Sequence, residues 1–261
     1  MNARMMIGGL VLPLLGFSTA LAETGTLRMQ FVYEGDATAP QAIDVNKDVE
    51  FCGRHGLTNE KLVINPENKG IKNVVLYVNT RAGGTKLPEM APQNRELTLA
   101  NLNCRFEPHI VIAQTGDTLK VTNPDPVGHN ANMNFFRNPP KNLTVAPNQD
   151  ISVELKEAEP APIPVDCNIH PWMRAYVVVL EHPFAAVSDE NGMLEIKDLP
   201  AGQSLNFRVY HEGLAQGKSF ADVKIDGKTQ NWRRNLLDLT IQPGDNELIQ
   251  VVVPAGTLTA D

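Results

Sequence analysis

Short runs of β-branched and aromatic residues, each closed by a turn, constrain this chain most. In the first run, residues 26–33, apolar side chains occupy every second position, as in a strand with one buried face. Gly-Asp, Asn-Pro, Asn-Gly and Pro-Gly pairs separate the runs. The later runs cover residues 72–80, 110–114, 118–123, 151–157, 176–182, 193–198, 205–212 and 248–254. This pattern predicts an all-β fold made of sandwiches or barrels. At most a short helix is expected, near residues 219–223 or 232–237.

The N-terminus predicts where the protein resides. Residues 1–22 carry one charge, Arg4, followed by an apolar run and an Ala-Leu-Ala ending. This order is typical of a secretory signal peptide cleaved after Ala22. The alternative is a short membrane anchor, but the run is shorter than the ~20 residues that a membrane span needs. We therefore expect a periplasmic or secreted protein that is not inserted in the membrane after cleavage.

The net charge narrows the classes of binding partner, and the cysteine count predicts one disulfide with one cysteine left over. The formal net charge is −7, which gives the chain no electrostatic reason to bind nucleic acid or an anionic membrane. Three cysteines are an odd number for an oxidising compartment, so two can pair and one is left over. If Cys167 has a chemical role, Cys52 and Cys104 are the natural disulfide. Three reduced cysteines, or another pairing, remain the alternative.

One short segment concentrates soft metal ligands. In PVDCNIHPWMR, Cys167, His170 and Met173 are spaced three apart, just before an expected strand. Thiolate, imidazole and thioether together suit copper, and a type 1 copper site adds a second histidine. The upstream stretch GDTLKVTNPDPVGHN supplies His129 after another expected strand. Both segments follow strand ends, so we expect the four side chains to meet at one pole of a sandwich.

These residues resemble the cupredoxin family, and its amicyanin-like group most closely. The matching features are the Cys-x-x-His-x-x-Met loop and the upstream elements Gly116-Asp117-Thr118, Asn123 and His129-Asn130. The resemblance implies a Greek-key sandwich over residues 96–183 that binds one type 1 copper. It also implies that Asn130 ties the two ligand loops together by hydrogen bonds. The chain departs from the family at Val165-Asp166, where an aromatic residue often precedes the cysteine.

The residues beside the ligands have two readings. Pro171 and Trp172 could form an apolar collar around an exposed edge of His170, where a redox partner docks, or they could serve packing alone. Cys167, His129 and Met173 could likewise be a buried cysteine, a turn histidine and a core methionine. Of the other histidines, we expect His109 to be structural, near Cys104. His55, His182 and His211 are expected in turns or on the surface.

A second resemblance covers the C-terminal part. Residues 185–212 contain Asp-x-Asn-Gly, a strand, Leu-Pro-Ala-Gly and another strand, and they resemble the carboxypeptidase regulatory-like β-sandwich modules. The expected organisation is a signal peptide (1–22), an N-terminal β segment that is possibly part of a second sandwich (23–95), a cupredoxin-like domain (96–183) and a C-terminal sandwich segment (184–261). A single cupredoxin with extra strands is the alternative.

The function that these patterns favour is an exported type 1 copper protein that carries single electrons between redox partners and is not an enzyme. A copper-binding carrier without redox function, or a structural or interaction β-sandwich protein, is the alternative. A Cys-His hydrolase is disfavoured because Cys167 and His170 share one tight loop, with no evident group to orient the base. The sequence names no donor or acceptor protein.

Overall fold

The computed structural model describes residues 23–81, 83–214 and 217–260. The chain is nearly all β, which confirms the predicted fold class. Within the described residues, helical structure is limited to α1 (Val49–Cys52) and the 3-10 turns η1 (Gly53–His55) and η2 (Arg233–Asn235). The predicted signal peptide, residues 1–22, lies outside the described residues. Across the described ranges, we find no helix with the length and apolarity that a membrane crossing requires.

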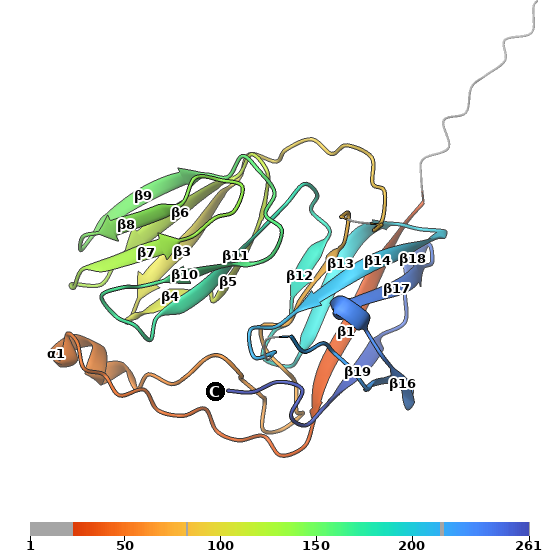
Figure 1. Cartoon of the computed structure of the whole chain (residues 1–261), viewed down its shortest axis with the longest axis horizontal. Helices are drawn as coiled ribbons and strands as arrows, with labels where there is room; N and C mark the ends of the chain where they lie inside the picture. Colours follow the sequence, from red (N-terminus) through yellow and green to blue (C-terminus); the bar gives the residue numbers. More distant parts are fainter. Residues whose placement is uncertain (1–22, 82, 215–216, 261) are drawn as a thin grey trace, which may run out of the picture.

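The first sandwich, residues 96–180, consists of two sheets (Figure 1). One sheet has the order β5 (Ile110–Gln114), β11 (Arg174–Leu180), β10 (Ile163–Asp166), β7 (His129–Met133) and β8 (Lys141–Val145). The other has the order β4 (Arg105–Glu107), β3 (Glu96–Leu102), β6 (Thr118–Asn123) and β9 (Gln149–Glu154). Apolar side chains that alternate along these strands, such as Leu119 and Val121 of β6, fill the space between the sheets.

The second sandwich is formed by strands that precede the first sandwich in the sequence and strands that follow it. One sheet has the order β13 (Met193–Pro200), β1 (Thr24–Glu34), β19 (Ile249–Pro254), β15 (Val223–Ile225) and β16 (Lys228–Gln230), with β18 (Gly244–Asp245) pairing β1. The other has the order β12 (Ala185–Val187), β2 (Val75–Val78), β14 (Gln203–Tyr210) and β17 (Leu236–Ile241). The first sandwich therefore lies in the chain between two strands, β2 and β12, that pair with each other.

The two sandwiches pack against each other through a separate apolar cluster. Strand β11 is buried on both faces: Val177 and Val179 point into the first sandwich, while Tyr176 and Val178 belong to the cluster shared with β2. Because neither face of β11 meets solvent, its sequence is a continuous apolar run without alternation.

Residues 36–60, which we call the covering segment, run outside both sandwiches and reach one pole of the first (Figure 1). The disulfide Cys52–Cys104 fixes the segment there, with a Cα–Cα distance of 5.5 Å, and it confirms the predicted bridge. Its closure of a long loop restricts the unfolded chain by about 4 kcal/mol in the chain-entropy model. Leu57 and Ile43 pack around the bridge together with Trp172.

The prediction of a short helix near residues 219–223 or 232–237 holds in part, at the second place and only as a 3-10 turn. Residues 219–223 lead into β15, and residues 232–237 contain only η2 before β17 begins. The α-helix that does form, α1, lies in the covering segment, where no element was expected. A four-residue helix has little intrinsic stability, and Cys52 at its end is held by the disulfide rather than by helix propensity.

Candidate metal centre

Strand pairing brings the two ligand segments together. His129 begins β7 and Cys167 follows β10, and these strands are antiparallel neighbours. The turn between β10 and β11 then carries His170 and Met173. Within it the Met173 N–H donates to the His170 carbonyl at 2.9 Å, and the Cys167 N–H donates to the Met173 carbonyl at 3.2 Å. Hydrogen bonds of the backbone therefore set the positions of the side chains that the sequence placed three apart.

The nitrogen and sulfur atoms of three predicted ligands converge. One ligand atom each from His129, Cys167 and His170 lies within 4.8 Å of the others, and all three side chains are buried. The two Nδ1 atoms are 3.0 Å apart, and Cys167 Sγ is 3.8 Å from Nδ1 of His170. Met173, 1% exposed, is buried in the same core. Two imidazole nitrogens and a soft sulfur form a donor set that suits copper.

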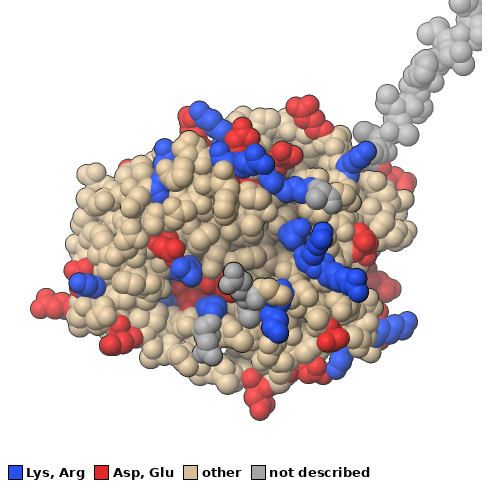
Figure 2. All heavy atoms as spheres, in the orientation of Figure 1, with Lys and Arg blue, Asp and Glu red and all other residues tan. Residues whose placement is uncertain are grey.

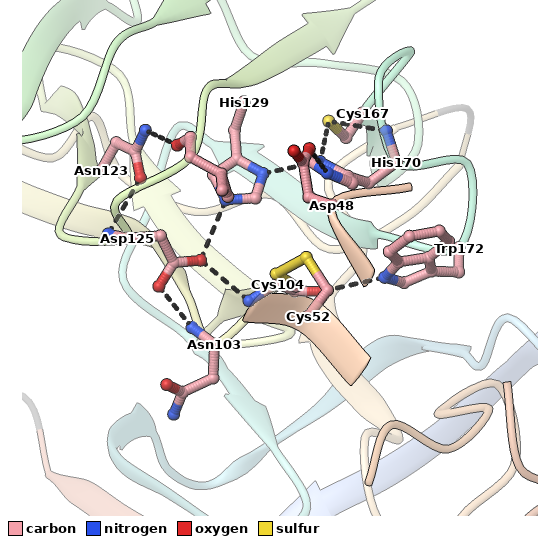
Figure 3. The surroundings of a disulfide bond; sticks show 11 residues. Asp48, Cys52, Asn103, Cys104, Asn123, Asp125, His129, Cys167, His170 and Trp172 are labelled. Atoms are coloured by element: carbon pink, nitrogen blue, oxygen red, sulfur yellow. Dashed lines mark hydrogen bonds and ion pairs between the residues drawn. A yellow bond between two sulfur atoms is a disulfide. The ribbon is translucent and has the colours of Figure 1, made fainter. Parts of the chain in front are cut away.

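Each imidazole is oriented by a carboxylate on its other nitrogen (Figure 3). His129 Nε2 donates to Asp125 Oδ2 at 2.9 Å, and His170 Nε2 donates to Asp48 Oδ2 at 2.8 Å. Neither Nδ1 atom is bonded to these carboxylates, and both lie beside Cys167, where a metal ion could bind. A carboxylate on the second nitrogen is the usual support for a metal-binding histidine, so the residues present fit a bound copper ion.

Hydrogen bonds favour the thiolate of Cys167. Burial opposes its ionisation, but the side chains of His129 and His170 and the backbone N–H groups of Asn130 and His170 favour the charged form and together outweigh that effect. The two N–H groups lie 3.4 Å from Sγ. The pKa of the thiol falls from its ordinary 9.0 to about 6, so the metal-binding form predominates at neutral pH.

Asp125 was not singled out from the sequence. It is 2% exposed and accepts hydrogen bonds from the N–H groups of Asn103 (2.7 Å) and Cys104 (2.8 Å) besides the imidazole. Burial disfavours the charged forms of Asp125 and His129. Their mutual hydrogen bond outweighs it only together with the N–H groups of Cys104 and Asn103 on Asp125 and with Cys167 beside His129, so the pKa of Asp125 is lowered and that of His129 is raised. An acid four residues before a candidate histidine was the signal that could have identified it.

Asn130 links the two ligand loops. Its N–H donates to Cys167 Sγ, and its side-chain Oδ1 accepts from the Asn168 N–H at 2.6 Å. Its Nδ2 donates to Asn142 at 2.5 Å. The resemblance to cupredoxins implied this linking role.

The covering segment changes the surroundings of His170. This side chain is fully buried, so the expected exposed imidazole edge was wrong: Asp48 covers it and bonds to it. Pro171 is exposed, whereas Trp172 is half-buried and donates its indole N–H to the Cys104 carbonyl at 3.0 Å. The ring centroids of Trp172 and His170 are 5.2 Å apart. The docking role of Pro171 and Trp172 stays a prediction.

The remaining histidines also lie partly elsewhere than expected. His182 lies in a bend and His211 opens a turn in which its carbonyl accepts from the Leu214 N–H at 3.1 Å, as the prediction of turn or surface positions allowed. Neither is on the surface: they are 2% and 1% exposed, because each bonds a backbone carbonyl inside the second sandwich or its junction. His55 is half-buried. His109 is buried and lines a cavity together with Cys104, close to where it was expected.

Comparisons with known proteins find similarity among solved structures. No family model and no curated protein matches the chain. Among solved structures, a copper-containing nitrite reductase from Thermus scotoductus SA-01 aligns at 20% identity over 39% of this chain and 25% of its own, with a TM-score of 0.30. A Cu(I) amicyanin variant aligns at 21% identity over 32% and 81%, with a TM-score of 0.30. A purple cupredoxin from Nitrosopumilus maritimus aligns at 20% over 33% and 98%, with a TM-score of 0.27. This chain thus spans a quarter of the length of the reductase.

Proposed function

We propose that this protein is an exported type 1 copper protein that carries single electrons between redox partners. The observation that carries the proposal is the buried convergence of two Nδ1 atoms and one Sγ atom, contributed by segments about forty residues apart in sequence, within 4.8 Å. Met173 is proposed as the weak axial ligand. When bound, copper would supply a centre that gains and loses one electron.

The residues of the chain would keep the ligand geometry constant. Asp125 and Asp48 hold the rings by their Nε2 atoms, and Asn130 holds the cysteine loop to the histidine loop. Burial of the three side chains excludes water from the ligand atoms. A site with fixed ligands needs little rearrangement when its charge changes, which favours an electron carrier over an enzyme.

The proposed partner is another redox protein, with Pro171 and Trp172 as the proposed docking residues. Nucleic acid is not proposed as a partner, since the formal net charge is −7 and acidic and basic side chains are interspersed on the face shown in Figure 2. The proposed location is periplasmic or secreted, which rests on the signal-like residues 1–22.

A copper carrier without redox function is the second candidate. One observation favours it: the covering segment buries His170, so a partner protein cannot touch the imidazole directly while Asp48 is in place.

Copper spectroscopy separates the two candidates. Residues 23–261, loaded with one equivalent of Cu(II), should show an intense blue absorption and a narrow copper hyperfine splitting by EPR. Both should be lost in Cys167→Ser, because the thiolate produces them. An ordinary pale cupric spectrum that the variant leaves unchanged would reject the electron carrier and favour the non-redox candidate. His55→Gln, outside the centre, is the matched control.

A further inference from the structure

Neither imidazole of the candidate metal centre reaches solvent. His170 is fully buried, and its Nε2 bonds Asp48 Oδ2 at 2.8 Å. His129 is fully buried as well, and its Nε2 bonds the buried Asp125 at 2.9 Å. The rate at which an electron crosses between two redox groups falls steeply with the distance between them. A protein that exchanges electrons therefore needs another side chain to connect this centre with its surroundings.

Trp172 is in the position that such a connection requires. Its ring centroid lies 5.2 Å from that of His170, and the two ring planes are inclined at 55°. Its indole N–H donates to the Cys104 carbonyl at 3.0 Å, which holds the ring in one orientation (Figure 3). The side chain packs against the core of the first sandwich and against the cluster around the disulfide, yet it is only half-buried. Trp172 thus lies beside the buried imidazole and is itself partly accessible.

The accessible part of Trp172 lines a cavity of about 320 Å³. Residues of the covering segment and of both sandwiches surround this cavity, and its apolar lining includes Ile43, Leu57 and Pro171. Protein interfaces commonly bury their central contacts in apolar pockets of this kind. A redox group that approaches the cavity therefore meets an aromatic ring that is one contact away from His170.

Asp48 offers a second connection, but a less favourable one. Its carboxylate contacts His170 directly, and the side chain is 42% exposed. Residues 44–50 around it are mostly exposed and hold three acids and one lysine. A partner protein that packed over this part of the covering segment would have to remove water from an ionised carboxylate, which is unfavourable. Contact with the indole of Trp172 removes apolar surface from water instead, which is favourable.

We infer that Trp172 carries electrons between His170 and the redox partner, while Asp48 keeps the partner away from the imidazole itself. The inference rests on the proposed function. One electron passes from the reduced partner protein through Trp172 and His170 to Cu(II), which becomes Cu(I), and the partner is oxidised by one electron. No bond is made or broken, and no proton moves.

Access is tested first on the metal-free protein, residues 23–261, with a neutral gadolinium chelate that broadens the NMR signals of the atoms it can approach. The ring signals of Trp172 should broaden more than those of His170. Trp232, in the core of the second sandwich, is the reference for a buried indole. Stronger broadening of His170 than of Trp172 would overturn the inference. This measurement uses the unmodified chain, so it decides the question even if a variant does not fold.

Conduction is tested by electron self-exchange between Cu(I)-loaded and Cu(II)-loaded copies, measured by NMR line broadening. Self-exchange has no net driving force, so a change in reduction potential does not bias the comparison. Trp172→Leu should slow the exchange severalfold, while the blue band and the EPR splitting stay as in the wild type. Trp172→Phe, which keeps an aromatic ring, should retain most of the rate. Ile169→Ala, which shortens the exposed side chain before His170 in the same loop, is the control and should leave the rate unchanged.

Asp48→Ala separates the two connections. It removes the carboxylate that covers the imidazole, so the exchange should be as fast as in the wild type or faster. Combined with Trp172→Leu, it should restore part of the lost rate, which a simple packing defect would not allow. Slower exchange in Asp48→Ala, or an unchanged rate in Trp172→Leu, would overturn the inference while the proposed function stands. A protein that never becomes blue would fail the proposed function, and the metal-free measurement would still show which ring is accessible.

Discussion

At the scale of single residues, two carboxylates support two imidazoles in different ways. Asp125 is buried and is held by two backbone N–H groups, so its position is fixed by the first sandwich itself. Asp48 comes from the covering segment, its side chain is 42% exposed, and its backbone φ is 45°. Asp125 therefore fixes the orientation of the His129 ring from within the first sandwich. The support that Asp48 gives to His170 depends on the covering segment staying in place.

Asp48→Asn should raise the reduction potential of the copper-loaded protein. Removing a negative charge beside His170 disfavours Cu(II) relative to Cu(I), by on the order of tens of millivolts because Asp48 is partly exposed to solvent. Voltammetry measures the shift. Asp44→Asn, which removes an exposed acid from the same segment, is the control and should have a much smaller effect. A lower potential in Asp48→Asn would contradict the expectation.

Motif spacing predicted which side chains converge better than it predicted the carboxylates that support them. The convergence of His129, Cys167 and His170 could be predicted because a candidate metal site restricts both residue type and spacing, while their role as ligands stays a prediction. Asp48 could not be predicted, since it is 122 residues from its partner His170 in a polar stretch without any pattern. The contact depends on the path of the covering segment, and no local rule encodes that path.

At the scale of elements, two histidines hold β2 near its ends. His211 Nε2 donates to the Lys72 carbonyl at 3.1 Å, and His182 Nε2 donates to the Val78 carbonyl at 2.9 Å. Each Nδ1 accepts a backbone N–H two residues later, from Gly213 at 3.0 Å and Phe184 at 3.2 Å. Protonation would replace each of these acceptors by a donor. Burial is the main reason that the pKa values of His182 and His211 fall to about 4.

The folded protein should lose stability as the pH falls from 6.5 toward 4. In that window His182 and His211 bind protons in the unfolded chain but not in the folded protein. The free energy of unfolding therefore decreases on acidification. The loss between pH 7 and pH 5 is about 2 kcal/mol for each histidine. Urea unfolding of metal-free protein at both pH values measures it.

The variant His182→Gln isolates one of these contributions. The free energy of unfolding of the variant should depend less on pH than that of the wild type, by the contribution of one histidine. The contribution of His129, whose pKa shifts the other way, is present in both proteins and cancels in this difference. Identical pH dependence in the two proteins would contradict the assignment.

Strand prediction succeeded where side chains alternate or apolar residues cluster between turns. Residues 110–114 and 118–123 coincide with β5 and β6. The predicted runs did not include β3, β4, β7, β8, β10, β12 or β15 to β18. Among these, strands of three or fewer residues, such as β15, β16 and β18, carry no readable period. The sequence indicated that the N-terminal segment is possibly part of the second sandwich, but it did not indicate that β1 pairs with β19, residues from opposite parts of the chain.

At the scale of the whole molecule, the first sandwich depends on its surroundings. The second sandwich covers Val178 and Leu180, and the covering segment supplies Asp48 and Cys52. None of these partners belongs to residues 96–183.

The isolated fragment 96–183 should therefore associate in solution, because an apolar sheet face becomes exposed. Size-exclusion chromatography measures this. The same fragment with Val178→Lys and Leu180→Gln should elute as a monomer, since only the interface face is changed. A monomeric unmodified fragment would show that the interface is not needed for solubility.

Insertion of one sandwich between the strands of the other also sets an order of assembly. The pairing of Met29 with Ile249 joins residues 220 positions apart, and β11, the last strand of the first sandwich, ends at Leu180. At a synthesis rate of about 5–20 residues per second, β1 waits roughly 10 to 45 s for β19, while the strands of the first sandwich are complete much earlier. Throughout that interval one edge of β1 is without its final neighbour. In a nascent chain β1, the first strand to be synthesised, is therefore the strand most exposed to wrong pairing.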